Sequence, residues 1–253
     1  SWLIHDLHDC LFGKEAYKGS KLQDLDLNNG ILTRIGAEAF ADCSDFATSE
    51  LVIPDTVDYL GQGVFNGISM SKLTFPIPFY TDGDAVCTMS YLLGKSNLNA
   101  IETVVVTRAE ELPAKMFVDC ASLRTASLPN GISKIPESAF FHCSALESIT
   151  LPDSLLEIGE MAFSGCTLSG DLVLPQHLET IGRDAFAVCK IDALVLNDSL
   201  RVIGSRAFEG ADVAGTVAIP ASVELVGTGA FVGCRNLNAF DVSPEMKLYF
   251  INE

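Results

Sequence analysis

Cysteine is the residue type in this chain whose spacing could support chemistry. A thiolate can act as a nucleophile, bind zinc or form a disulfide. Six of the eight cysteines follow an aromatic residue by three positions, namely Cys43, Cys120, Cys143, Cys166, Cys189 and Cys234. Other copies of the same pattern carry Ser20, Ile68 and Ala211 at this place, which indicates a small and mostly buried position. We therefore predict structural free thiols, because buried cysteine packs as a small apolar residue.

The remaining polar groups give weaker signals. Cys10 and Cys87 lie outside the pattern, so a disulfide between them remains an alternative. His5 and His8 could hold a metal on one face of a helix, but we favour the polar face of a capping helix. The segment Thr81–Asp84 is too short for a calcium loop and indicates a turn. With four histidines and no nucleophile motif, we predict no catalytic or metal site, no cofactor, and a protein that is not an enzyme.

A period of 23 residues organises the sequence. Phe140 returns as Phe163, and Cys143 returns as Cys166. Self-similarity at a fixed period of about 20 to 50 residues is typical of a solenoid, in which each unit packs only on its neighbours. The aromatic residues of the successive copies are Tyr17, Phe40, Phe65, Phe117, Phe140, Phe163, Phe186, Phe208 and Phe231.

The whole chain is therefore expected to form one α/β solenoid. Residues 1–11 would cap its open end, and repeats would occupy 12–76 and 112–248. Between them, the long interval predicts a degenerate repeat with an insertion at 77–111. The apolar run Met246–Ile251 is followed by no polar capping unit, so we expect the natural chain to continue or this end to be covered by a partner.

Each unit contains a strand, a proline that ends it, and a turn. Leu146–Leu151 alternates apolar and small polar residues, which predicts a half-buried strand paired in parallel with its copies. A proline follows and ends the hydrogen-bonded ladder. In the turn, Gly159 would allow a close approach between repeats, and Ala162 and Phe163 would point inward. We expect a curved rod with a parallel sheet on one face and short helical or irregular turns on the other.

The outward side chains of the strands follow from the alternation. They are small, favour β-structure and are mostly uncharged, without histidine or aromatic residues. The insertion Ile77–Asn99 adds a cluster of aromatic residues that do not belong to the repeated aromatic positions. Insertions in solenoids emerge on a face that often binds ligands. The predicted contact residues are Thr103, Thr125, Ser127, Ser148, Thr150 and Asp171 on the strands, with Phe79, Tyr80 and Tyr91 in the insertion.

The charge balance restricts the partners. The chain carries 33 acidic and 16 basic residues, for a formal net charge of −17. A polyphosphate would be repelled by this field, so we exclude nucleic acid. No apolar run is long enough to span a membrane, and Ser1–Cys10 does not resemble a signal peptide. We expect a monomer.

The recurring I-G-x-x-A-F-x-x-C-x-x-L-x-x-I-x-L-P, clearest at Ile135–Pro152 and Ile158–Pro175, resembles the BspA-like, Treponema pallidum-type leucine-rich repeats. The resemblance covers about Phe12–Val242. Departures are modest: Asn197 replaces a proline, and Ala211 replaces a cysteine. The resemblance implies a right-handed leucine-rich-repeat solenoid of a bacterial cell-surface or secreted protein, with a role in adhesion to host or matrix proteins.

The sequence therefore favours a non-enzymatic module that binds a protein or a glycan. One alternative is a structural spacer or scaffold within a larger polypeptide, which the uncapped C-terminal run favours. A further alternative is a cytoplasmic interaction scaffold, because free thiols suit that compartment.

Overall fold

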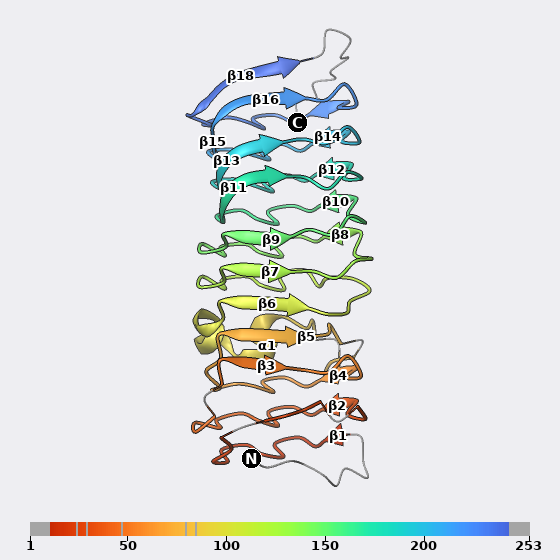
Figure 1. Cartoon of the computed structure of the whole chain (residues 1–253), viewed down its shortest axis with the longest axis vertical. Helices are drawn as coiled ribbons and strands as arrows, with labels where there is room; N and C mark the ends of the chain where they lie inside the picture. The colour runs from red at the N-terminus through yellow and green to blue at the C-terminus, as the bar shows by residue number, and fades with distance from the viewer. Residues whose placement is uncertain are drawn as a thin grey trace.

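A computed structural model describes residues 11–242, except positions 24, 29, 47, 79 and 84. The chain forms an elongated stack of coils, with similar strands lying one above another from one end to the other (Figure 1). The strands pair in parallel, so the predicted parallel-strand solenoid is confirmed. The predicted contact residue Phe79, most of the N-terminal cap with His5, His8 and Cys10, and the run Met246–Ile251 lie outside the described residues.

The long strands form one face of the stack, which we call the front face. Five of them make a continuous parallel sheet, comprising β3 (Glu50–Val52), β5 (Lys72–Phe75), β6 (Thr103–Val106), β7 (Thr125–Ser127) and β9 (Ser148–Thr150). Thr103 aligns with Thr125, and Thr125 with Ser148. The strand expected in the degenerate repeat is therefore present as β6, and it bridges the sheet across the insertion.

Farther along the chain, the front face is built from separate sheets. The first is three-stranded and comprises β11 (Thr167–Val173), β13 (Lys190–Val195) and β15 (Asp212–Val213). The second pairs β16 (Gly215–Ile219) with β18 (Leu237–Val242). Strand β9 is not hydrogen-bonded into a sheet with β11, so the front face is interrupted between them.

Two-residue strands form the side of the stack where each repeat begins. Three of them pair near the N-terminus, namely β1 (Leu11–Phe12), β2 (Arg34–Ile35) and β4 (Tyr59–Leu60). Five more pair in one sheet, namely β8 (Lys134–Ile135), β10 (Glu157–Ile158), β12 (Thr180–Ile181), β14 (Val202–Ile203) and β17 (Leu225–Val226). This five-stranded side sheet runs without a gap past the level at which the front face is interrupted.

The predicted aromatic column fills the interior. The rings of Phe140 and Phe163 stack with centroids 5.2 Å apart, and the same stacking runs from Phe117 to Phe231. A shorter stack runs from Tyr17 to Phe65. Each fully buried phenylalanine contributes roughly 2–3 kcal/mol of transfer free energy, so the column is a main source of stability.

The column is divided where the insertion enters. Helix α1 (Met89–Leu93) and the 3-10 helix η1 (Lys95–Ala100) lie between Phe65 and Phe117. Met89 and Leu92 are fully buried there, the N–H of Phe65 donates to the carbonyl of Leu92, and the N–H of Met89 donates to the carbonyl of Met116. Aliphatic side chains therefore replace rings at this level. Helix elsewhere in the described chain is absent, and the turns opposite the front face are irregular.

Glycine allows the repeats to approach closely at the start of each turn. A Cβ atom added to Gly159 would lie 2.9 Å from the carbonyl oxygen of Ile135, and Gly182 and Gly204 are equally crowded by the repeat before them. The N–H of Gly159 also donates to the Ile135 carbonyl, at 2.7 Å. The expected close approach at Gly159 is therefore confirmed, and it joins the repeats on either side of the front-face interruption.

Candidate binding face and groove

Along the front-face strands, side chains alternate between buried and more exposed positions, as predicted. Thr125, Ser148 and Thr150 are exposed on the front face, while Thr103 and Ser127 are partly buried there. The Thr125 hydroxyl donates to that of Thr103, at 3.0 Å. These residues come from three neighbouring strands, β6, β7 and β9, so the structure brings them together on one surface.

The predicted aromatic residues do not join that surface. Tyr80 is 61% exposed, but its backbone forms an isolated bridge to Tyr59 in β4, on the side of the short strands. Tyr91 is only 8% exposed, which corrects the prediction that it is a contact residue. Its hydroxyl donates to the Leu60 carbonyl at 3.1 Å, and burial raises the pKa of this phenol. Tyr91 therefore anchors the insertion to the core.

Asp82 completes this anchor. Its carboxylate accepts hydrogen bonds from the N–H of Gln62, at 2.8 Å, and from the hydroxyl of Tyr59. It also shares the single hydroxyl proton of Tyr91 with the Leu60 carbonyl. These donors lower the pKa of Asp82 below its usual value, and the backbone N–H of Gln62 has the largest effect. In the described part of Thr81–Asp84, Asp82 therefore serves as a hydrogen-bond acceptor that fixes the loop. Within the described residues, no group of three or more His, Cys, Asp or Glu side chains could hold a metal ion.

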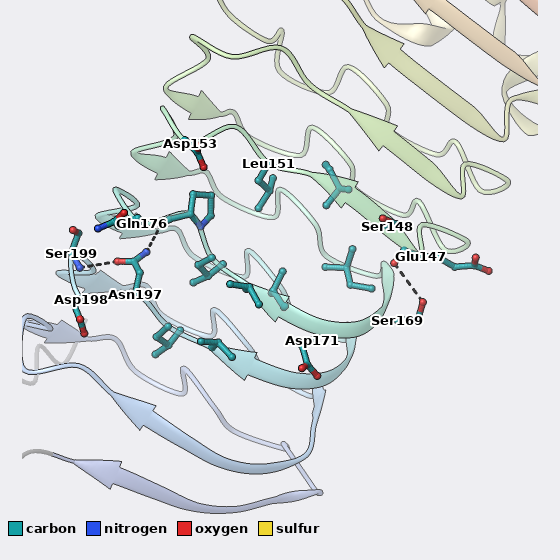
Figure 2. Close-up of a pocket in the computed structure, with 18 residues that line it drawn as sticks. Glu147, Ser148, Leu151, Asp153, Ser169, Asp171, Gln176, Asn197, Asp198 and Ser199 are labelled. Carbon is teal, nitrogen blue, oxygen red and sulfur yellow. Dashed lines mark hydrogen bonds between the residues drawn. The ribbon is translucent and has the colours of Figure 1, made fainter.

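A groove lies in the front face between β9 and β11, as shown in Figure 2. It has a volume of about 760 Å³ and is lined by 18 residues of three successive repeats. Leu151 lies on its floor, and Ser148 and Asp171, both predicted as contact residues, lie at its border (Figure 2). We call this feature the β9–β11 groove.

A change in residue spacing opens the groove. In the repeat of β9, the buried leucine comes three residues after the cysteine, at Leu146, whereas in the next repeat Leu168 comes only two residues after Cys166. Strand β11 therefore begins directly after its cysteine and contains a register shift between Leu168 and Asp171. Gly170, inside the shift, has a φ of 97°, a conformation that favours glycine. The altered path separates β11 from β9.

The interruption also exposes part of the core. Ile149 and Leu151 of the β9 repeat are only partly buried, whereas their counterparts in the β7 repeat, Ala126 and Leu128, are buried. Partly exposed aliphatic side chains on the floor of a groove are available for contact with a ligand. The alternation over Leu146–Leu151 places Ile149 and Leu151 on the inward side of the strand, so their exposure was not predicted.

The border of the groove is acidic. Of its 18 described lining residues, four are Asp or Glu and none is Lys, Arg or His. Glu147 forms an ion pair with Arg124 outside the groove, at 2.7 Å. Asn197, which replaces the repeat proline, donates from Nδ2 to the Pro175 carbonyl at 2.7 Å and accepts the N–H of Ser199. The departure at Asn197 therefore ties the end of β13 to the preceding repeat.

A second groove lies where the side sheet is interrupted by the insertion. It has a volume of about 1030 Å³, and Ile77, Val86 and Lys134 are among its lining residues. Strand β8 forms the free edge of the five-stranded side sheet here. Pro136 occupies the place of the glycines whose N–H groups donate to the preceding repeat, so this edge lacks that donor. Both grooves thus lie where stacking of one sheet stops.

Most of the described cysteines are buried structural groups. The cysteines that follow the repeat aromatic by three positions are all free, and most are fully buried. The Cys143 thiol donates to the carbonyl of Phe117, and that of Cys189 to the carbonyl of Phe163, at 3.0 and 2.9 Å. Burial raises the pKa of Cys120 and Cys189 to about 12. Cys87 is also free and buried, and Cys10 lies outside the described residues.

Parallel strands and stacked turns define a leucine-rich-repeat solenoid of the protein-interaction class. A family model described as the BspA type leucine rich repeat region matches residues 11–104 and 110–238. The chain belongs to this BspA-type family.

Two crystal structures show the likeness. A T. pallidum leucine rich repeat protein is 36% identical, with a TM-score of 0.52, covering 59% of this chain and 73% of that one. A leucine-rich repeat protein from Bacteroides ovatus is 21% identical, with a TM-score of 0.53, covering 95% of this chain and 66% of that one. No curated protein matches the chain in sequence.

Among the described residues, no helix has the length and hydrophobicity needed to cross a membrane.

Proposed function

We propose that the chain is a non-enzymatic, monomeric binding module that recognises a protein through its front face. The observation that carries this proposal is the continuous strand surface of β6, β7 and β9, whose exposed residues are hydroxylic and uncharged and which borders the β9–β11 groove. Small polar side chains beside partly exposed aliphatic residues suit an interface with an apolar centre and a polar border.

The family supports a location at the cell surface or in the secreted fraction, with a role in adhesion to a host or matrix protein. A glycan is a less favoured ligand, because the front-face positions on β6, β7 and β9 carry no aromatic side chain on which a sugar ring could stack. Tyr80 is exposed on a different side of the stack, beside β4.

The test uses the chain immobilised as bait and a partner first identified by chemical crosslinking. Thr125→Lys with Ser148→Lys places two positive charges on the front face, and we expect it to reduce partner binding at least tenfold. A matched control, Ala121→Lys with Ser144→Lys, adds the same charges to exposed positions in the turns of the same repeats. Binding that is equal in both double variants and the unaltered chain would refute a front-face interface.

A further inference from the structure

We propose that the β9–β11 groove binds an extended segment of a partner protein that carries a basic residue at each end and aliphatic residues between them. This inference rests on the proposed function and specifies the partner of the front face. Its basis is the arrangement of charge and apolar surface within the groove, together with the main-chain edges on its two sides.

The carboxylates lie at the two ends of the groove. At one end, Glu147 directly precedes β9, and Asp171 lies within β11 just after its register shift. At the other end, Asp153 and Asp198 lie beyond the ends of β9 and β13 (Figure 2). The 18 described lining residues include no cationic side chain, and Arg124, from outside the groove, pairs with Glu147. A ligand with separated positive charges is complementary to such a site.

The middle of the groove is apolar. Ile149 and Leu151 are half-buried there, and Leu172 and Leu174 complete the floor. Burial of aliphatic side chains against this floor would contribute roughly 25 cal/mol for each Å² removed from water. A purely ionic ligand would leave this surface uncovered, whereas a segment with central aliphatic residues would cover it.

The dimensions suit a peptide. The six residue steps from Glu147 to Asp153 correspond to about 20 Å of extended chain, at about 3.3 Å per residue. An extended heptapeptide spans the same distance, and its residues 1, 3, 5 and 7 point to one side. Strands β9 and β11 face the groove without pairing to each other, so their edges can accept main-chain hydrogen bonds. A small amine would reach only one end.

The probe is the acetylated and amidated heptapeptide Lys-Ser-Val-Ser-Val-Ser-Lys. Its control, Lys-Lys-Ser-Val-Ser-Val-Ser, has the same composition and charge but places both basic residues at one end. Binding to the full chain is measured by isothermal titration calorimetry at low and physiological ionic strength. We expect the probe to bind at least tenfold more tightly than the control, and both to weaken with added salt.

Three variants locate the site. Asp171→Asn with Asp198→Asn removes one carboxylate from each end and should weaken probe binding at least tenfold. Ser169→Trp places a bulky side chain on the exposed border and should have a similar effect. Glu110→Gln with Glu111→Gln removes two charges near the second groove and should change the affinity less than twofold. Circular dichroism confirms that each variant is folded.

Three results would each overturn the inference. The first is equal affinity for probe and control, and the second is an equal loss of probe affinity in the groove variants and in Glu110→Gln with Glu111→Gln. The third is binding of N-acetyl-lysine methylamide as tight as that of the heptapeptide. Other results distinguish a failure of the groove inference from a failure of the proposed front-face function. If the crosslinked partner is retained by Asp171→Asn with Asp198→Asn but lost from Thr125→Lys with Ser148→Lys, the groove inference is wrong and the front-face function is supported. If front-face charges have no effect on the partner, the proposed function falls whatever the peptide does.

Discussion

Strands β3 to β9 and strands β11 to β18 arise from the same repeat, yet they form different surfaces. In the first region, five strands hydrogen-bond as one sheet even across the insertion, because β6 preserves the register. In the second region, the strands divide into separate sheets. The segment between β5 and β6 has 27 residues, whereas that between β6 and β7 has 18. This lengthening is therefore less disruptive than a one-residue change in the spacing between cysteine and leucine, which alters the path into the strand.

The two regions nevertheless share an unbroken interior. The side sheet β8-β10-β12-β14-β17, the aromatic stack and the glycine contacts all continue past the level of the groove. The repeats therefore stay stacked while the front face opens. Four predictions test this division, and the first three concern the interior that joins the two regions.

The largest expected effect comes from the ring that spans the interruption. Phe163 is fully buried and stacks on Phe140 across it, so Phe163→Ala should lower the free energy of unfolding by about 4 kcal/mol. Phe231→Ala, at a partly buried ring near the end of the stack, should cost about half as much. Urea denaturation followed by circular dichroism measures both. Similar losses would indicate that the column does not join the two regions.

Next in size is the glycine contact at the same level. Gly159→Ala places a Cβ atom 2.9 Å from backbone atoms of the preceding repeat, and we expect a loss of about 3 kcal/mol. The control is Gly13→Ala, because a Cβ atom there meets nothing within 4 Å. Thermal denaturation of the two variants should separate them clearly. A Gly159→Ala protein as stable as the control would mean that the repeats can move apart without cost.

The thiols test whether the groove reaches the core. Cys189 has its pKa raised from 9.0 to about 12 by burial, so its thiol stays neutral in the folded chain while the unfolded chain ionises above about pH 9. Stability should therefore fall as the pH rises from about 9 towards 12, and Cys189 should account for about 2 kcal/mol of this loss at pH 10.5.

The matched variant for this effect is supplied by the chain itself. Ala211 occupies the equivalent buried position in the next repeat, so Cys189→Ala should fold and should show a smaller loss of stability between pH 9 and 10.5. At pH 8, Cys166, beside the groove, should react with a disulfide reagent as slowly as Cys120. Rapid labelling of Cys166 alone would show that the groove opens into the interior.

The smallest effect concerns backbone strain in the second region. Val188 has a φ of 55° and is 68% exposed, whereas the same turn position in the preceding repeat is Gly165. Val188→Gly should stabilise the chain by about 1 kcal/mol, because the left-handed conformation is costly for a branched side chain. Val232→Gly, at an exposed valine that lacks a positive φ, should instead destabilise it by a similar amount. Differential scanning calorimetry compares them.

Features that recur were predictable from the sequence. Phe163, Gly159 and Cys166 each occupy a position found in many copies, so their types alone define a buried ring, a close approach and a small core slot. Tyr91 occurs once, in an insertion without periodicity, and its burial depends on the Leu60 carbonyl and Asp82, which no pattern places beside it.

The groove was predictable only in part. Ser148 and Asp171 were identified from strand alternation, and the shorter spacing from Cys166 to Leu168 is visible in the sequence. Its consequence, the loss of pairing between β9 and β11, depends on how two different backbone paths stack. That outcome is a property of neighbouring repeats in three dimensions and not of either repeat alone.

Hydrogen–deuterium exchange of the backbone amides measures whether the front sheet stops after β9 and whether a groove separates it from β11. Peptides covering residues 148–151 and 171–173 should contain amides that exchange at least tenfold faster than those of residues 125–128 in β7, which has a partner on both sides. Equal protection of all three segments would show a continuous sheet and would contradict the account.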